Sequence, residues 1–137
     1  MSDLFEPISY TLWKSDKAAF ADAIGRSFRE TGFAVITDHP VDDEVIAHAN
    51  KAAKDFFALP EEAKEKYHDA EGGRQRGYTP FGTENAKGQK AADLKEFWHT
   101  GRKLPEGSRY RATMKDTPVV DEVPEFDEAT YAFYQEM

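Results

Sequence analysis

The strongest local signal in the sequence is Arg76-Gly77-Tyr78-Thr79-Pro80-Phe81-Gly82-Thr83-Glu84, which is followed by Asp93-Leu94-Lys95-Glu96-Phe97-Trp98-His99-Thr100-Gly101. Residues 94–99 indicate a strand, on which Lys95, Phe97 and His99 share one face and Leu94, Glu96 and Trp98 share the other. The first stretch lies within residues 70–92, which have no helical period and are rich in glycine. We therefore expect a long loop that leads into a short strand.

Three residues of this loop are candidates for contact with a substrate, namely Arg76, Tyr78 and Phe81. Arg76 carries a planar guanidinium that suits a carboxylate. Gly77 and Gly82 permit backbone bends around the two aromatic side chains. Two interpretations stay open from the residues alone: a structural loop that aromatic side chains pin to the strand, and the mouth of a substrate site.

The regions on both sides of the loop predict helices packed on a few strands, which is an α+β fold. On the N-terminal side we expect a strand at 7–13, a helix that Ser15 or Asp16 caps and Gly32 ends, and a buried strand at 33–37. A helix capped by Asp42 and a short helix beginning at 59–62 follow. Residues 105–124 indicate irregular structure, and an apolar stripe from Phe126 to Met137 indicates a last helix.

Composition narrows the class of protein. The 137 residues fit one domain, 1–137, and 18 basic against 26 acidic residues give a net charge of −8, which argues against nucleic acid as a partner. The absence of cysteine excludes disulfides and thiolate metal sites. No apolar run is long enough to span a membrane, and the acidic start Met1–Glu6 is not a secretory signal, so we expect a cytoplasmic protein.

The sequence contains no complete catalytic constellation. A site for non-haem iron needs two histidines and one carboxylate, commonly with a His-x-Asp or His-x-Glu pair, and none of the histidines begins such a pair. The four are His39, His48, His68 and His99. No Gly-x-Ser-x-Gly, dinucleotide or Walker pattern is present either. We therefore expect no catalytic and no metal-binding residue, and interpret the histidines as surface or supporting residues.

Four segments in order resemble the N-terminal region of the isopenicillin N synthase-like enzymes, the iron(II)- and 2-oxoglutarate-dependent dioxygenases. The segments are Gly32-Phe33-Ala34-Val35-Ile36-Thr37-Asp38-His39, Phe56-Phe57-Ala58-Leu59-Pro60-Glu61-Glu62-Ala63-Lys64, Arg76-Gly77-Tyr78 and Asp93-Leu94-Lys95-Glu96-Phe97. The resemblance runs from about Ile8 to the end of the chain. Pro40 is a departure, because the family usually has glycine there.

The resemblance implies a larger enzyme than these residues contain. In the family, a His-x-Asp…His triad on a double-stranded β-helix, or jelly-roll, binds iron, and an Arg-x-Ser pair binds the cosubstrate. Neither motif occurs here, so the resemblance implies an N-terminal region of an incomplete jelly-roll fold that ligates neither Fe(II) nor 2-oxoglutarate itself. The intact enzyme would couple oxidative decarboxylation of 2-oxoglutarate to attack on a substrate C–H bond. Isopenicillin N synthase itself does not use 2-oxoglutarate, which leaves the cosubstrate open.

Two hypotheses for function follow from the resemblance. In the first, the chain is the scaffold and substrate rim of an oxygenase acting on a small organic molecule, Arg76 pairs with an anionic group, Tyr78 and Phe81 shape the pocket, and the 137 residues alone are inactive. In the second, the chain is a free-standing, non-catalytic binding or assembly domain with the same layout. Either way, apolar surface that a missing C-terminal jelly-roll would cover predicts self-association; the candidates are Phe33, Val35, Phe97 and residues 126–137.

Overall fold

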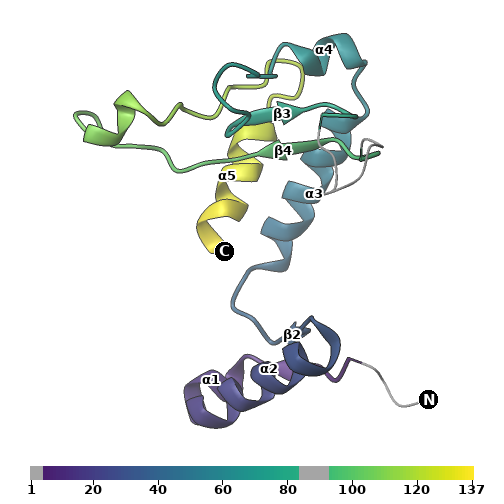
Figure 1. Ribbon diagram of the computed structural model, residues 1–137, viewed down its shortest axis with the longest axis vertical. Coiled ribbons are helices and arrows are strands. Elements are labelled where there is room, and N and C mark those ends of the chain that lie inside the picture. The colour runs from purple at the N-terminus through teal and green to yellow at the C-terminus, as the bar shows by residue number, and fades with distance from the viewer. Residues whose placement is uncertain (1–4, 84–92) are drawn as a thin grey trace. The chain divides into compact units, whose positions relative to one another are not determined.

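The computed structural model describes residues 5–83 and 93–137. They fall into two compact units, residues 1–41 and 42–137. Helices dominate both units and each contains one pair of very short strands (Figure 1), so the predicted α+β class is confirmed. Among the described residues, no helix has both the length and the apolar character needed to cross a membrane.

Unit 1 is a pair of helices beside a two-stranded parallel sheet. Its elements are β1 (Ile8–Ser9), α1 (Thr11–Ser15), α2 (Lys17–Thr31) and β2 (Ile36–Thr37). The Asp16 carboxylate accepts a hydrogen bond from the Ala19 backbone at 3.0 Å, which satisfies a free N–H of the first turn of α2. Gly32 ends α2 in the left-handed conformation, with φ of 80°. The predicted cap at Asp16 and end at Gly32 are both confirmed.

The two strands predicted in unit 1 are longer than the observed ones. The strand expected over 7–13 stops at Ser9, because the backbone turns: Ser9 Oγ accepts from the Thr11 N–H at 3.3 Å and the Tyr10 carbonyl accepts from the Trp13 N–H at 3.0 Å. Local hydrogen bonds of serine compete with a strand ladder in this way. The strand expected over 33–37 covers only its last two residues. It is not buried, because Ile36 is half-buried and Thr37 is exposed, and Phe33 outside the strand is 67% exposed.

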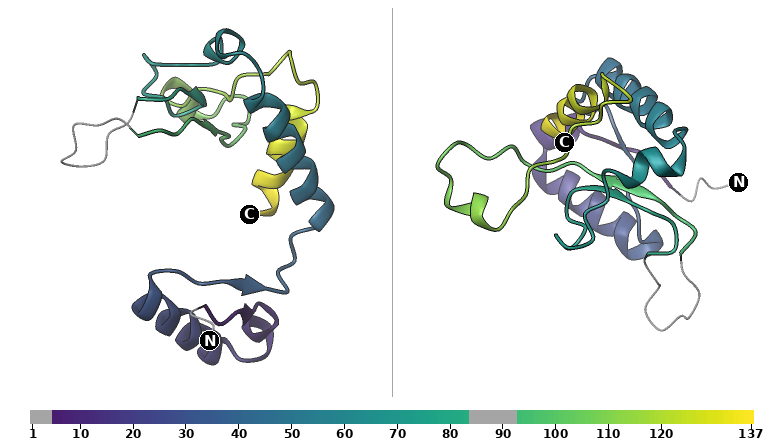
Figure 2. Two further views of the ribbon diagram at one scale, coloured as in Figure 1. Left: turned by 90° about the vertical axis from the view of Figure 1, so that its right-hand side faces the viewer. Right: turned by 90° about the horizontal axis from the view of Figure 1, so that it is seen from above.

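Unit 2 places two long helices side by side and covers one end with short strands and loops (Figures 1 and 2). Its elements are α3 (Asp43–Phe57), α4 (Glu61–Glu65), β3 (Gly77–Thr79), β4 (Phe97–His99), the 3₁₀ turn η1 (Arg109–Ala112) and α5 (Phe126–Glu136). The Asp42 carboxylate caps α3 by accepting from the Glu44 backbone at 2.8 Å, as predicted. The irregular course of 105–124 around η1 and the final helix also agree with the sequence.

Phe56 on α3 is the centre of the core of unit 2. It is fully buried, and its ring centroid lies 4.7 Å from that of Phe126 on α5 and 5.0 Å from that of Trp98 on β4. Ala52 and Ala129 are also buried, which lets the two helices approach closely. Burial of one such aromatic side chain contributes about 1.5–3 kcal/mol, so this cluster secures β4 against the helix pair.

The strands β3 and β4 pair in antiparallel fashion, with Tyr78 opposite Trp98. The prediction of unbroken loop over 70–92 is therefore wrong at β3; its residues 84–92 lie outside the described part of the chain. A three-residue strand between glycine and proline carries no detectable period, and only its partner specifies it. The strand predicted over 94–99 begins three residues later, at Phe97.

Candidate functional site

The structure places the three predicted substrate residues in three different environments. Tyr78, in the middle of β3, is fully buried, whereas Phe81 is 54% exposed. Arg76 lies one residue before β3 and is half-buried. The three residues are close in sequence, but only Phe81 and part of Arg76 are accessible to a ligand in this structure.

Arg76 borders a charged cavity of about 260 Å³. Its Nη1 donates a hydrogen bond to the Gln75 carbonyl at 2.5 Å. The cavity wall also carries basic and acidic side chains, among them Lys66, His68, Asp69, Lys115 and Asp116. Lys115 pairs with Asp69 and Lys66 with Glu122, so Arg76 is the cation of this wall that no carboxylate of the described residues neutralises, and it favours an anionic group of a ligand.

Asp69 in the same wall is already engaged by other groups. Its Oδ2 lies 2.6 Å from Lys115 Nζ and its Oδ1 accepts from the Gly72 N–H at 2.8 Å. The hydrogen bond from Lys115 and the one from Gly72 lower the pKa of Asp69 below its ordinary value. Because Asp69 already has these two partners, it competes weakly with a ligand anion for the Arg76 guanidinium.

Behind β3 lies a buried network of Lys64, Glu96 and Tyr78. Lys64 Nζ is 2.7 Å from Glu96 Oε2, and the Tyr78 hydroxyl donates to the same oxygen at 2.5 Å. Lys64 also donates to the Phe57 carbonyl at 3.3 Å. Burial, then the hydrogen bond to Glu96, raises the pKa of Tyr78 above its ordinary value, so the phenol remains a donor. The network ties α4 to both strands.

A second network of the same residue types joins α4 to the segment before α5. Glu122 accepts a hydrogen bond from the Tyr67 hydroxyl and pairs with Lys66 Nζ at 2.6 Å. The Asp121 N–H donates to the Tyr67 oxygen at 3.0 Å. The bonds from Lys66 and then Tyr67 lower the pKa of Glu122 to about 2, and burial followed by Glu122 raises the pKa of Tyr67.

The charged members of both networks are not predicted from the sequence as site residues. Glu96 alternates with Phe97 on the predicted strand, which placed it on the face shared with Trp98, and that face is the one turned toward the core. A carboxylate on a core face signals a buried partner. Lys64 gave no such signal, because a single lysine on a short helix is usually solvated.

The described residues contain no group of three histidine, aspartate or glutamate side chains that could hold a metal ion. The histidines have other partners: His48 Nε2 lies 3.2 Å from Glu125, His68 Nδ1 3.2 Å from Glu65, and His99 Nδ1 3.1 Å from the Arg74 carbonyl. The described residues therefore do not form an iron site of two histidines and a carboxylate, and we assign none of them as an iron ligand.

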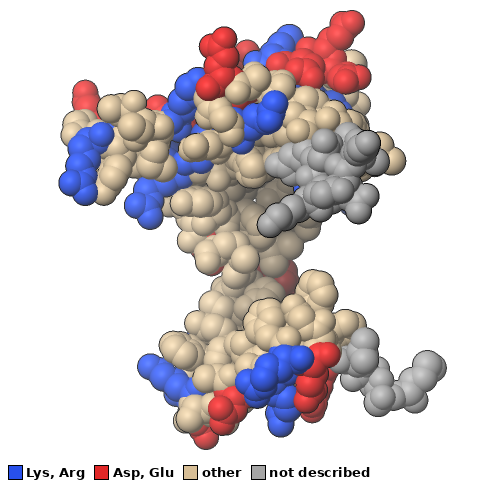
Figure 3. Space-filling view, viewed as in Figure 1, with Lys and Arg blue, Asp and Glu red and all other residues tan. Residues whose placement is uncertain are grey.

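An apolar groove of about 480 Å³ runs between α3, α5 and β4 in unit 2. Its walls are mostly apolar and include Phe57, Phe97, Phe133, Tyr134 and Met137. The surface over the C-terminal half of α5 shows few charged side chains (Figure 3). Phe126 at the start of the stripe is buried in the core, which corrects the expectation that the whole stripe is exposed, whereas Met137 is 82% exposed.

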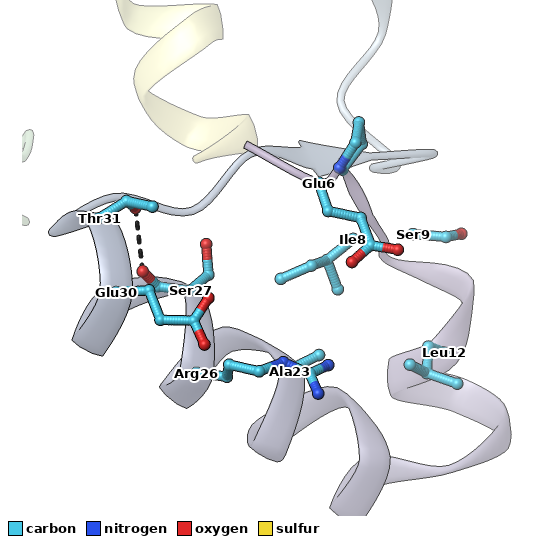
Figure 4. Close-up of a pocket in the computed structure, with 10 residues that line it drawn as sticks. Glu6, Ile8, Ser9, Leu12, Ala23, Arg26, Ser27, Glu30 and Thr31 are labelled. Atoms are coloured by element: carbon cyan, nitrogen blue, oxygen red, sulfur yellow. Dashed lines mark hydrogen bonds between the residues drawn. The ribbon is translucent and has the colours of Figure 1, made fainter. Parts of the chain in front are cut away.

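Unit 1 has a cavity of its own, about 280 Å³, between β1 and α2 (Figure 4). Ile8 and Leu12 form its apolar side, and Arg26 and Glu30 of α2 line the other. The Thr31 hydroxyl beside them donates to the Ser27 carbonyl at 2.9 Å. Arg26 and Glu30 are exposed and carry their charge in solvent, so this cavity is not assigned a ligand.

Comparisons with known proteins agree with this architecture. The family model described as non-haem dioxygenase in morphine synthesis N-terminal matches residues 6–122. An alpha-ketoglutarate dependent kainoid synthase from Digenea simplex is 38% identical over 51% of this chain and 21% of its own length. A proline hydroxylase, buaE, from Petromyces alliaceus is 35% identical over 61% of this chain and 28% of its own. The chain thus spans less than a third of these relatives.

Solved structures extend the likeness over almost the whole chain. A putative 2OG-Fe(II) oxygenase family protein from Caulobacter crescentus is 45% identical with a TM-score of 0.79, and the match covers 96% of this chain and 43% of that one. A full-length protein from Neurospora crassa, solved in complex with alpha-KG, shares the fold at 22% identity and a TM-score of 0.73 over 99% of this chain and 44% of its own. The resemblance seen in the sequence is confirmed: this chain belongs to the N-terminal family of the non-haem, 2-oxoglutarate-dependent dioxygenases.

Proposed function

We propose that residues 1–137 form a single N-terminal region of an isopenicillin N synthase-like, iron(II)- and 2-oxoglutarate-dependent oxygenase that oxidises a small organic substrate. The observation that carries the proposal is the family match over residues 6–122. Iron(II) and 2-oxoglutarate supply the oxidising chemistry when bound, and we assign none of the described residues to them. The cysteine-free sequence supports a cytoplasmic location.

Within such an enzyme we propose that unit 2 supplies scaffold and part of the substrate rim. Arg76 pairs with an anionic group of the substrate, and exposed Phe81 adds apolar contact. Tyr78 supports the rim from the core, because its hydrogen bond to Glu96 fixes β3, which lies between Arg76 and Phe81 in the sequence. The guanidinium of Arg76 at the wall of the charged cavity supports an anionic substrate.

Replacement of Arg76 by alanine in the enzyme that contains this chain tests the rim. A charge-assisted hydrogen bond to a carboxylate is worth about 1.5–3 kcal/mol, so we expect KM for substrate to rise by roughly ten- to a hundredfold. Arg109→Ala is the matched control, because Arg109 stacks on Tyr110 in the exposed turn η1. An unchanged KM in Arg76→Ala would remove Arg76 from the substrate site.

For the isolated 137 residues we expect no turnover, since the chain lacks a His-x-Asp pair. The measurement is decarboxylation of 2-oxoglutarate with added Fe(II), with and without candidate substrates. Release of CO₂ above the level seen with heat-denatured chain would contradict the assignment of the chemistry to other residues.

A second candidate function is a non-catalytic binding or assembly domain, and the apolar groove favours it. In the isolated chain the groove is free to meet the same surface of a second copy, so we expect self-association in sedimentation velocity. Phe133→Lys should weaken it, because a charge enters an aromatic wall. A clean monomer that binds no hydrophobic dye would contradict this candidate.

A further inference from the structure

We propose that Gly101 is a positioning residue for Arg76. The Arg76 guanidinium occupies the space in which any other residue at position 101 would place its side chain. The inference rests on the proposed function, in which Arg76 contacts the substrate, and it adds a residue that acts through Arg76.

An ideal Cβ on Gly101 would overlap the side chain of Arg76. That Cβ would lie 1.8 Å from Nε, 2.2 Å from Cζ and 2.6 Å from Nη2 of Arg76. All three atoms belong to one planar group, so the guanidinium lies over the α-carbon of Gly101. The φ of Gly101 is outside the left-handed region, so any residue could adopt its backbone conformation. Glycine is required here because Arg76 fills the space that a side chain would need.

The surrounding structure holds the backbone of Gly101 in place. It is buried, and its N–H donates to Thr117 Oγ1 at 2.9 Å. It follows β4 by two residues, while Arg76 precedes β3 by one, and the pairing of Gly77 with His99 brings the two together. Because the strand pair fixes both backbones, the absence of a side chain at 101 decides where the guanidinium can lie.

Polar contacts do little to hold Arg76 in place. Nη1 bonds only to the neighbouring Gln75 carbonyl, and Nε is buried with no hydrogen-bond partner among the described residues. A buried N–H without an acceptor is unfavourable, so other packing must keep the group there. The fit over Gly101 accounts for its position.

A methyl group at position 101 should therefore move Arg76 without unfolding the chain. The atoms that it meets are the far end of a flexible side chain, which swings aside more easily than a backbone. We expect Gly101→Ala to unfold at nearly the wild-type temperature. In the enzyme that contains this chain we expect about a tenfold higher KM for substrate with kcat little changed, because misplacement of a binding group weakens binding.

Two measurements separate positioning from general damage. The first is the ¹⁵Nε–H resonance of Arg76 in the 137-residue chain, which should shift in Gly101→Ala. The second is the double variant Arg76→Ala/Gly101→Ala, in which KM should equal that of Arg76→Ala, since the side chain that the methyl displaces is gone. Gly25→Ala is the matched control: its Cβ would also meet a guanidinium, 3.1 Å from Arg29 Nη1, but on α2 in unit 1.

The outcomes distinguish this inference from the proposed function. If Arg76→Ala raises KM while Gly101→Ala leaves both KM and the resonance unchanged, the positioning role is overturned and the substrate contact stands. If Gly101→Ala shifts the resonance but neither variant changes KM, Gly101 positions Arg76 and the substrate contact is overturned. Additive losses in the double variant would also overturn the positioning role.

Discussion

Two networks of unit 2 have the same chemistry and opposite surroundings. In each, one glutamate accepts a hydrogen bond from a tyrosine and pairs with a lysine at the end of α4 or just after it. In the first, the side chains of Lys64 and Glu96 are 8% and 13% exposed. In the second, those of Lys66 and Glu122 are 63% and 23% exposed. The comparison isolates the effect of solvent on one arrangement of groups.

Burial decides which of the two networks fixes the fold. An exposed ion pair gains little, because water solvates each partner nearly as well. A buried pair has lost that water, so each partner depends on the other and on the tyrosine for its hydrogen bonds. Lys64 and Glu96 therefore specify where β4 lies against α4, whereas Lys66 and Glu122 only reinforce a contact that the buried ring of Tyr67 already makes.

Loss of Glu96 should destabilise the chain more than any other change considered for the two networks. Glu96→Ala leaves the ammonium of Lys64 buried without a counterion and the Tyr78 hydroxyl without an acceptor, which should lower the free energy of unfolding by about 3–5 kcal/mol. Lys66→Met, in the exposed network, should cost less than about 1 kcal/mol. Urea denaturation of the 137-residue chain measures both, and equal losses would show that exposure does not govern the two networks.

The next effect is seen in alkali and belongs mainly to the buried network. The pKa of Tyr78 is raised in the folded chain, so the phenol binds its proton more tightly than in the unfolded chain. The resulting stability is complete below the ordinary pKa of 10 and is lost as the pH rises through the folded value. We expect the free energy of unfolding to fall above pH 10 and to fall less in Tyr78→Phe. A parallel decline in both proteins would contradict this.

Much of the fold could be predicted from sequence, because helix ends carry local chemistry. Asp16, Gly32 and Asp42 mark helix ends through their own side chain or backbone freedom, and each was found. Strand β3 could not be predicted, because it has only three residues and depends on a partner strand about twenty residues away. The run 33–37 predicts a buried strand, and that prediction is wrong because an apolar run is buried only where another element packs on it. The separate expectation that Phe33 is part of an uncovered apolar surface agrees with its 67% exposure.

The candidate site was predicted less completely than the fold. The chemistry of its side chain marks Arg76 as a candidate. Its contact with Gly101 depends on the pairing of β3 with β4, which no local sequence pattern predicts. The sequence predicts Tyr78 in the wall of the pocket. Nothing in the residues around Tyr78 indicates that its hydroxyl donates a hydrogen bond to the buried Glu96. Residue type predicts which groups can act, and tertiary contacts decide which of them meet.

The smallest expected effect belongs to the exposed network and appears in acid. The pKa of Glu122 falls from 4.5 to about 2 in the folded chain, so its contribution to stability is present above pH 4.5 and is lost as the pH falls toward 2. Glu122→Gln should therefore flatten the decline of the unfolding free energy between those values. Asp69 titrates below its ordinary value as well, so Asp69→Asn is the control that separates the two carboxylates. The unfolding free energy of Glu122→Gln could instead decline as steeply as that of the wild type, while that of Asp69→Asn declines less. Asp69 would then be the acid-sensitive group. The two networks would then differ in burial but not in their response to pH.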